Sequence, residues 1–346
     1  MRIVIRTDSS LQIGSGHLMR CMTLAQRYRE DGHEIVFICR DLTGNMSAFV
    51  QHEGFGLVML PAVVAGDVLT GYEKWLTVTQ EQDAAETVAI VRALGPVDRL
   101  VVDSYAIDDT WEKVIRPCVG EIMVIDDLAN RKHDCDILLD QNFYLDRDVR
   151  YQGLVPKNCR LLLGPKYALL REEFYRVRES MRSRDDKLRN VLVFYGGVDA
   201  TDETSKAIQS LSALRTEGIL AEVKVTVVVG VSNARKDDIA RLCMRAGFRY
   251  LCQVSNMAEL MAEADLMLGA GGSTTWERCF LGLPAIVTAI AENQFQICDD
   301  CAEAGLFYYL GQWDRVRVED ICNGVKEMMI SSRRLAMKKQ MSQLMG

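Results

Sequence analysis

Short apolar segments rich in β-branched residues alternate with longer segments of helical periodicity, beginning at the second residue of the chain. Residues 2–6 predict a buried strand, and residues 17–30 carry apolar side chains at the spacing of one helix face. Repeated βα alternation of this kind predicts a parallel sheet with helices on both of its faces. Further strands are expected at 34–39, 57–60, 99–102 and 122–125, and further helices at 45–53, 81–94 and 109–116.

The alternation is interrupted by a polar segment, residues 171–187, whose density of Arg, Glu, Ser and Asp favours an exposed linker. We therefore expect an N-terminal Rossmann-like α/β domain at 1–170 and a C-terminal one at 188–346. Two such domains would face each other across a central cleft, with ligands at the carboxyl ends of the strands. In the second domain, strands are expected at 190–194, 223–229, 250–253, 266–268 and 285–289, and helices at 202–214, 236–246, 257–264 and 274–281.

Composition and charge narrow the class of protein. The formal net charge of -7 disfavours a protein that binds nucleic acid through a basic surface. Arg6 and Asp8 interrupt the apolar start too early for a signal peptide, and no apolar run is long enough to span a bilayer. The 11 cysteines are scattered and odd in number, which indicates reduced thiols, and Cys298-x-x-Cys301 lacks the second pair of a zinc ribbon. These features predict a cytoplasmic protein without a membrane span.

A glycine turn with a histidine follows the first strand. Gly14 and Gly16 open the first helix, but Met19 stands where the dinucleotide fingerprint needs a third small residue, so an NAD site is disfavoured. His17 lies at the helix start, where the positive end of the helix dipole disfavours the protonated ring. A neutral imidazole in a cleft is suited to general-base chemistry, so His17 is the catalytic candidate. The alternative is a histidine that only caps or packs against the helix.

The strongest local signal is the segment 266–277, in which a strand runs into a glycine turn and then a helix. Backbone N–H groups at such a helix start attract anions, and serine and threonine hydroxyls add donors for phosphate oxygens. Glu277 in the first turn can accept hydrogen bonds from the two hydroxyls of a ribose. The alternative is a purely structural turn. The candidate nucleotide-binding residues are Gly271, Gly272, Ser273, Thr274, Thr275 and Glu277.

Acidic residues after other strands are weaker candidates. Asp103, Asp126 and Asp127 follow predicted strands and could line the same cleft. The tripeptide 134–136 matches the D-x-D pattern of metal-dependent sugar transferases. Because matches this short are common by chance, a solvated loop is expected there, and no essential metal is predicted.

Four motifs, taken in order, carry a family resemblance over most of the chain, from Arg2 to about Gly311. The chain resembles the UDP-2,4-diacetamido-2,4,6-trideoxy-β-L-altropyranose hydrolases of pseudaminic acid biosynthesis. The second and fourth motifs are shared with wider GT-B glycosyltransferases, whereas the Tyr-Ala-Leu-Leu-Arg part of the third narrows the choice. The motifs are Arg6-Thr7-Asp8, Gly14-x-Gly16-His17, the segment 163–174 and Gly271-Gly272-Ser273-Thr274-x-x-Glu277.

The resemblance implies a GT-B fold, with UDP held by the C-terminal domain and no cofactor or metal. It implies hydrolysis in which His17 activates water, the anomeric carbon–oxygen bond breaks and the anomer inverts. The free sugar would then serve pseudaminic acid biosynthesis and flagellin glycosylation.

The same resemblance places four further side chains near the sugar or the diphosphate. They are Asp8, Tyr105, Asn293 and Gln294. Asp8 could instead orient the histidine. Residues 62–81 and the tail after Gly311 match nothing in this resemblance.

Three other functions remain open at this point. A GT-B glycosyltransferase using a UDP-amino sugar would release UDP only when an acceptor is present. A UDP-sugar 2-epimerase would produce a C2 epimer. A non-catalytic UDP-sugar binding protein would bind the nucleotide and convert nothing.

Overall fold

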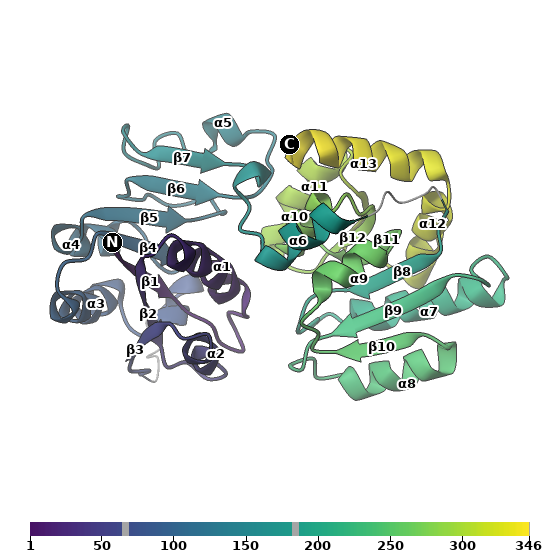
Figure 1. Cartoon of the computed structure of the whole chain (residues 1–346), viewed down its shortest axis with the longest axis horizontal. Coiled ribbons are helices and arrows are strands. Elements are labelled where there is room, and N and C mark those ends of the chain that lie inside the picture. The colour runs from purple at the N-terminus through teal and green to yellow at the C-terminus, as the bar shows by residue number, and fades with distance from the viewer. Residues whose placement is uncertain (64–68, 182–186, 346) are drawn as a thin grey trace. The chain divides into compact units, whose positions relative to one another are not determined.

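The computed structural model of the chain describes residues 1–63, 69–181 and 187–345. The chain forms two compact units. In Figure 1 the first runs from purple to teal and the second from teal through green to yellow. Unit 1 comprises Met1–Asn142 and Asp146–Leu169, and unit 2 comprises Phe143–Leu145 and Leu170–Gly346. The two parallel-sheet α/β domains expected from the sequence are therefore present.

The sheet of unit 1 has seven parallel strands in the order β3-β2-β1-β4-β5-β6-β7. The chain runs outward from β1 through β2 to β3 and then returns to β4 on the other side of β1. This reversal between β1 and β4 is the position where open α/β sheets form a ligand crevice. The strands are β1 (Arg2–Thr7), β2 (Glu34–Arg40), β3 (Gly56–Leu60), β4 (Arg99–Asp103), β5 (Glu121–Ile125), β6 (Ile137–Asp140) and β7 (Arg160–Leu163).

Both faces of this sheet are covered because successive side chains of a strand point to opposite sides. Ile3 and Ile5 of β1 belong to a buried cluster with residues of α1 and α2, whereas Val4 belongs to a second cluster with α3 and α4. The helices of unit 1 are α1 (Gly16–Glu30), α2 (Ser47–His52), η1 (Gly71–Leu76), α3 (Gln80–Leu94), α4 (Asp109–Ile115), η2 (Arg116–Cys118), α5 (Arg147–Arg150) and η3 (Pro165–Tyr167).

The sheet of unit 2 has six parallel strands in the order β10-β9-β8-β11-β12-β13. Here the chain direction across the sheet reverses between β8 and β11, so the loops after these two strands lie side by side. The strands are β8 (Asn190–Phe194), β9 (Lys224–Val229), β10 (Arg249–Cys252), β11 (Leu266–Ala270), β12 (Ala285–Ala289) and β13 (Tyr308–Gln312).

The chain ends with two helices that belong to unit 2. Met337 and Met341 of the last helix are buried, and this helix packs against α10 and α12. The helices are α6 (Glu172–Ser180), α7 (Glu203–Thr216), α8 (Lys236–Ala246), α9 (Met257–Glu263), α10 (Thr274–Phe280), η4 (Glu292–Gln294), α11 (Phe295–Glu303), α12 (Val318–Met328) and α13 (Ser331–Met345).

The strands and helices expected from the sequence are present, with ends displaced by a few residues. The sequence did not reveal η1, α5, β6, β7, α11, β13 or α12. Part of the expected linker 171–187 forms α6, which contacts α9 and α10 of unit 2, and residues 182–186 of that linker lie outside the described residues.

The cysteines form no disulfides, although the thiols of Cys135 and Cys159 lie 3.6 Å apart. All 11 are free, and Cys298 and Cys301 are buried on α11, as expected for packing residues. Among the described residues, no helix combines the length and apolar character that crossing a membrane requires.

Candidate active site

The chain reversal in unit 1 brings the predicted histidine beside a strand end. Thr7 of β1 pairs with Asp103 of β4, so the loops that follow these strands leave the sheet together. Gly14 has φ +80°, a conformation that favours glycine, and Gly16 begins α1. This short turn returns the chain over the strand ends and places His17 in the first turn of α1.

His17 forms a short hydrogen bond with Asp103. Its Nδ1 lies 2.6 Å from Asp103 Oδ1, and the side chains of His17 and Asp103 are 9% and 0% exposed. An ionised carboxylate can only accept, so Nδ1 carries the proton that is donated. In the neutral ring this leaves the lone pair on Nε2, the form in which a histidine accepts a proton from water.

Arg20 binds both oxygens of the same carboxylate. Its Nε and Nη2 donate to the two oxygens of Asp103 at 2.6 and 2.7 Å, and its Nη1 donates to Asp127 at 2.9 Å. Burial would raise the pKa of Asp103, but Arg20 and His17 hold it well below its usual range. Asp103 therefore stays ionised and keeps the His17 ring in one orientation.

Tyr105, a predicted site residue, packs directly against the histidine. The ring centroids of Tyr105 and His17 are 4.5 Å apart in an edge-on arrangement, and the Tyr105 hydroxyl donates to Asp127 Oδ1 at 2.6 Å. Asp127 thus links Tyr105 to Arg20. The sequence placed Asp127 only at a strand end and gave no sign of either partner.

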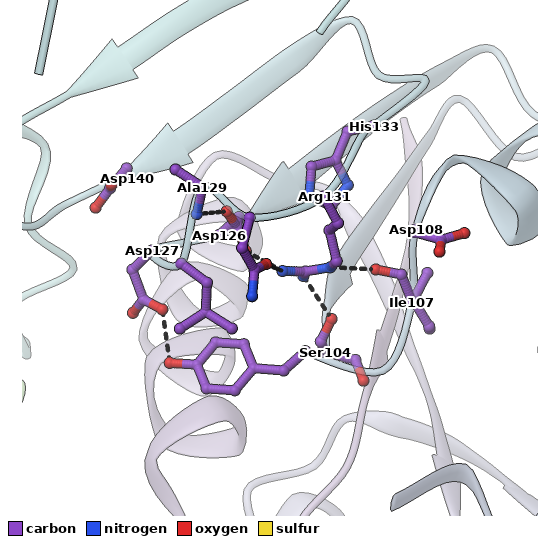
Figure 2. A network of polar contacts seen from close by, with 12 residues as sticks. Ser104, Ile107, Asp108, Asp126, Asp127, Ala129, Arg131, His133 and Asp140 are labelled. Carbon is purple, nitrogen blue, oxygen red and sulfur yellow. Dashed lines mark hydrogen bonds and ion pairs between the residues drawn. The ribbon is translucent and has the colours of Figure 1, made fainter. Parts of the chain in front are cut away.

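A half-buried arginine fixes the loop after β4 (Figure 2). Arg131 donates to the carbonyl oxygens of Ser104 and Ile107, at 3.0 and 2.8 Å, and to Asp126 Oδ1 at 2.6 Å. These bonds join the loop after β4 to the loop after β5. Because Asp126 precedes Asp127, they also set the distance between Asp127 and Tyr105.

A second carboxylate beside this network, Asp140, has a raised pKa. Tyr151 has one hydroxyl proton but lies 3.0 Å from Asp140 Oδ2 and 3.1 Å from Asp126 Oδ2. Both contacts are satisfied if Asp140 is protonated and donates to the Tyr151 oxygen, which then donates to Asp126. Burial and neighbouring Asp127 raise the pKa of Asp140 to about 8, although Asp140 Oδ1 accepts a hydrogen bond from the Asn142 backbone N–H at 2.9 Å that opposes the rise. Arg150 Nε, 3.7 Å from Asp140 Oδ2, is too distant for a hydrogen bond.

Asp140→Asn is expected to make folding stability less dependent on pH. Folded Asp140 keeps its proton up to about pH 8, whereas the unfolded chain loses it near its usual value of 3.8. Between pH 5 and 7 the wild-type chain therefore loses stability as pH rises, by about 1.4 kcal/mol per pH unit from this group.

The measurement is denaturant unfolding at pH 5, 6 and 7. The stability of Asp140→Asn relative to wild type should rise steadily over this range, and Asp148→Asn, a change at a side chain 91% exposed, should show no such trend. A constant difference between Asp140→Asn and wild type would show that Asp140 is ionised in the folded protein.

Asp8 lies in a different set of buried polar groups. Its Oδ1 accepts a hydrogen bond from the Arg40 backbone N–H at 2.6 Å and pairs with Arg6 at 2.7 Å. The carboxylate that orients the histidine is therefore Asp103 and not Asp8. Asp8 Oδ2 is buried without a hydrogen-bond partner among the described residues.

Both aspartates of the D-x-D tripeptide accept hydrogen bonds from one arginine side chain. Arg116 Nε donates to Asp134 Oδ2 at 3.2 Å, and its Nη1 donates to Asp136 Oδ2. Over residues 1–63, 69–181 and 187–345, no group of three or more His, Cys, Asp or Glu side chains is arranged to hold a metal ion.

The glycine turn of unit 2 is set by close packing on α11. A Cβ added to Gly271 would lie 2.2 Å from Cys298 Sγ, and one added to Gly272 would lie 3.6 Å from Gln294 Nε2. The Gln294 Oε1 accepts a hydrogen bond from the Ile290 backbone N–H at 3.0 Å. Gly271, Gly272 and Gln294 thus lie close together, and exposed Asn293 lies in the same η4 turn.

The hydroxyl residues of this turn have separate environments. Ser273 is at the N-cap position of α10 but its side chain makes no capping hydrogen bond, contrary to the capping role its position suggests. Ser273 is exposed and Thr274 is half-buried. Thr275 is buried, and its Oγ1 accepts from Arg278 Nη2 at 2.9 Å, so Thr275 stabilises the turn itself.

Glu277 is paired with an arginine that the sequence assigned to the linker. Arg171 Nε and Nη2 lie 3.2 and 3.1 Å from Glu277 Oε1, and Arg171 also pairs with Glu173. Burial raises the pKa of Glu277, and Arg171 opposes that rise. One of the two Glu277 oxygens, Oε1, is therefore committed to Arg171.

The loop after β8 lies beside this turn because Phe194 of β8 pairs with Gly269 of β11. Asp199 in that loop accepts hydrogen bonds from the backbone N–H groups of Glu203 and Thr204, at 3.0 and 2.9 Å. A carboxylate of the chain itself thus satisfies amides at the start of α7. The sequence analysis did not identify this role of Asp199.

Solved structures similar to this one match nearly the whole chain. The crystal structure of Acinetobacter baumannii MurG matches with a TM-score of 0.65 and 13% identity, over 98% of this chain and 94% of that protein. LpCGTa in complex with UDP matches with a TM-score of 0.66 and 14% identity, over 99% of this chain and 93% of that one. The chain has the GT-B fold.

Sequence comparisons agree with this GT-B assignment. Residues 190–346 match the profile of the glycosyltransferase family 28 C-terminal domain. The chain is 25% identical over 87% of its length to the uncharacterized protein MJ1062 of Methanocaldococcus jannaschii, of which it spans 58%. It is 26% identical over 85% of its length to a UDP-2,4-diacetamido-2,4,6-trideoxy-beta-L-altropyranose hydrolase of Campylobacter jejuni, of which it spans 93%. The similarity to a hydrolase of this name that the four sequence motifs indicated is thereby confirmed.

Proposed function

We propose that this GT-B protein hydrolyses UDP-2,4-diacetamido-2,4,6-trideoxy-β-L-altropyranose to UDP and the free sugar, with inversion at the anomeric carbon. The observation that carries the proposal is the His17–Asp103 pair, with Nδ1 bound to a carboxylate and the lone pair on Nε2. The similarity to the Campylobacter jejuni hydrolase over most of both chains supports the choice of reaction and sugar.

In the proposed mechanism His17 Nε2 accepts a proton from a water molecule as the water oxygen attacks the anomeric carbon. The carbon–oxygen bond to UDP breaks with its electron pair leaving on the diphosphate, and the attack from the opposite face inverts the anomer. The positive charge that develops on the His17 ring is stabilised by Asp103, which Arg20 keeps ionised and in place. Tyr105, packed on the ring, would contact the sugar.

Unit 2 is proposed to bind UDP at the turn after β11. Gly271 and Gly272 let a ligand approach the backbone, while exposed Ser273 and half-buried Thr274 offer hydroxyl groups to the diphosphate. Asn293 and Gln294 in the η4 turn would contribute amide groups. The family 28 profile covers this unit, and LpCGTa, which has the same fold, was solved in complex with UDP; both support a nucleotide as the ligand. Hydrogen bonds to the leaving diphosphate would replace a metal ion, so we propose a metal-independent reaction without a cofactor.

Glu277→Gln is expected to weaken UDP binding by about tenfold, because a hydrogen bond to a charged acceptor is worth about 1.5–3 kcal/mol. The contact assigned to Glu277 is with the ribose, so the loss should depend on the ribose hydroxyls. Calorimetric titration with UDP and with 2′-deoxy-UDP measures this dependence.

Wild type is expected to prefer UDP, and Glu277→Gln should lose most of that preference. The exposed Glu259→Gln change on α9 serves as the matched control and should leave both affinities unchanged. An undiminished preference for UDP in the Glu277→Gln variant would remove Glu277 from the ribose site.

The decisive experiment uses purified protein, the UDP-sugar and EDTA, with no acceptor. Release of UDP together with an inverted free sugar, followed by NMR, is the expected result. Release only after an acceptor is added would identify a glycosyltransferase, and a C2 epimer of the nucleotide sugar would identify an epimerase. Binding without any conversion would identify a UDP-sugar binding protein. We place the reaction in the cytoplasm, in the route to pseudaminic acid.

A further inference from the structure

The segment 71–76, which no sequence motif covers, brings aromatic side chains to the histidine. Trp75 of η1 lies with its ring centroid 5.9 Å from that of His17 and 5.6 Å from that of Tyr105. Tyr72 of the same turn lies 4.8 Å from Trp75 and 5.2 Å from Tyr105. We call these three residues, Tyr72, Trp75 and Tyr105, the aromatic wall.

The position of the wall is determined by the core beneath it. Leu76 at the end of η1 is fully buried in the cluster under α3 and α4, and Val78 joins the same cluster. Thr77 between them has φ +60°, a left-handed conformation that turns the chain sharply after Leu76. The anchored turn therefore holds Trp75 beside His17 through packing.

The polar and apolar contacts of His17 are distinct. Nδ1 faces Asp103 and Arg20, whereas the ring packs edge-on against Trp75 and Tyr105. Tyr72 is 38% exposed, although burial of large aromatic rings normally stabilises a fold. Trp75 is half-buried and Tyr105 is 8% exposed, so the wall offers its surface mainly at Tyr72 and Trp75. An aromatic surface next to a candidate catalytic group is suited to a ligand with an apolar face.

We propose that the aromatic wall binds the methyl-bearing face of the acetamido-deoxy sugar and thereby determines which sugars reach His17. The inference rests on the proposed function, which identifies the ligand as a sugar that has lost its 6-hydroxyl group and carries two acetamido groups. Loss of the 6-hydroxyl leaves a methyl group at that carbon, and each acetamido group that replaces a hydroxyl carries another. Water solvates methyl groups poorly, and an aromatic face binds them. A fully hydroxylated sugar would leave hydroxyl groups against the rings without partners.

Kinetics of Tyr72→Ala and Trp75→Ala test the wall. Loss of an aromatic contact present before and during reaction is expected to raise KM by about tenfold and leave kcat within about twofold. Trp75→Phe should restore most of the wild-type KM. Trp313→Ala, at a ring 40% exposed in unit 2, is the matched control, and all variants should keep the wild-type affinity for UDP. If Trp75→Ala fails to fold, the exposed Tyr72 position decides the result.

A second measurement separates this inference from the hydrolysis itself. Saturation-transfer NMR with the free 2,4-diacetamido-2,4,6-trideoxy-L-altrose needs no turnover. Wild type should transfer saturation most strongly to the methyl protons, and Tyr72→Ala and Trp75→Ala should reduce that signal by at least about half. Methyl saturation without hydrolysis would contradict the proposed reaction and support the wall. Hydrolysis with unchanged KM in both variants, or no methyl saturation in wild type, would overturn the wall.

Discussion

Replacing His17 with asparagine is expected to lower kcat by about 10²- to 10⁴-fold, the contribution of a positioned general base. Asparagine retains a hydrogen-bonding group at the Asp103 side but has no basic nitrogen in the Nε2 position. UDP affinity should remain near the wild-type value, because the nucleotide is assigned to unit 2 and His17 lies in unit 1. The loss should therefore appear in kcat and kcat/KM together.

Single-turnover UDP release and UDP titration measure the two quantities separately. His52→Asn is the matched control, because the His52 side chain is 81% exposed on the last turn of α2. That variant should behave as wild type in both measurements. Turnover within tenfold of wild type in His17→Asn would mean that another group activates the water and that His17 only supports Tyr105.

The fold could be predicted because two local signals agree over most of the chain. Segments of β-branched residues such as 223–229 and helical periodicity such as 236–246 identify βα units, and such units form parallel sheets. The elements that escaped prediction are mostly short. The strands β6 and β7 span only four residues each, too few for a pattern of alternation to be distinguished from a loop.

The position of the histidine was also predictable, because a glycine turn between a strand and a helix is a local feature. Its partners were not. Asp103 and Arg20 are 83 residues apart, and they meet only because β1 and β4 are neighbours in the sheet. Strand order is a property of the whole fold, so a sequence alone could place Asp103 at a strand end but could not pair it with the histidine.

The same reason explains Arg171 and Trp75. Arg171 and Glu277 are 106 residues apart, and Arg171 lies in a segment whose charge density indicates a solvated linker. Trp75 lies in a short 3-10 turn without periodicity. Its proximity to His17 follows from the burial of Leu76, which no local pattern specifies. Local chemistry thus located each candidate centre, and only tertiary packing showed which side chains complete it.

Asp103→Asn is expected to lower kcat by about 10⁴-fold, the loss seen when a carboxylate that orients a catalytic histidine becomes an amide. The amide would present either an N–H group, which forces His17 Nδ1 to accept and moves the proton to Nε2, or a weaker neutral acceptor. In the first case Nε2 loses the lone pair that the mechanism requires. UDP affinity should again be unaffected.

Stability must be measured alongside, because Asp103 also pairs with Arg20, whose side chain is only 9% exposed. Removing one partner of a buried ion pair costs about 3–5 kcal/mol. The pKa of Asp103 is depressed in the folded chain, so its stabilising contribution is present above the unfolded value near 4 and is lost below it. Asp103→Asn should therefore lose less stability than wild type between pH 4 and pH 2.

Comparison with Arg20→Gln distinguishes an oriented histidine from a weakened fold. That variant leaves Asp103 able to accept from His17 Nδ1 but removes the same ion pair, so it should lose similar stability and much less activity. Equal losses of kcat in the folded Asp103→Asn and Arg20→Gln proteins would mean that the ion pair, and not the histidine tautomer, is what the reaction requires.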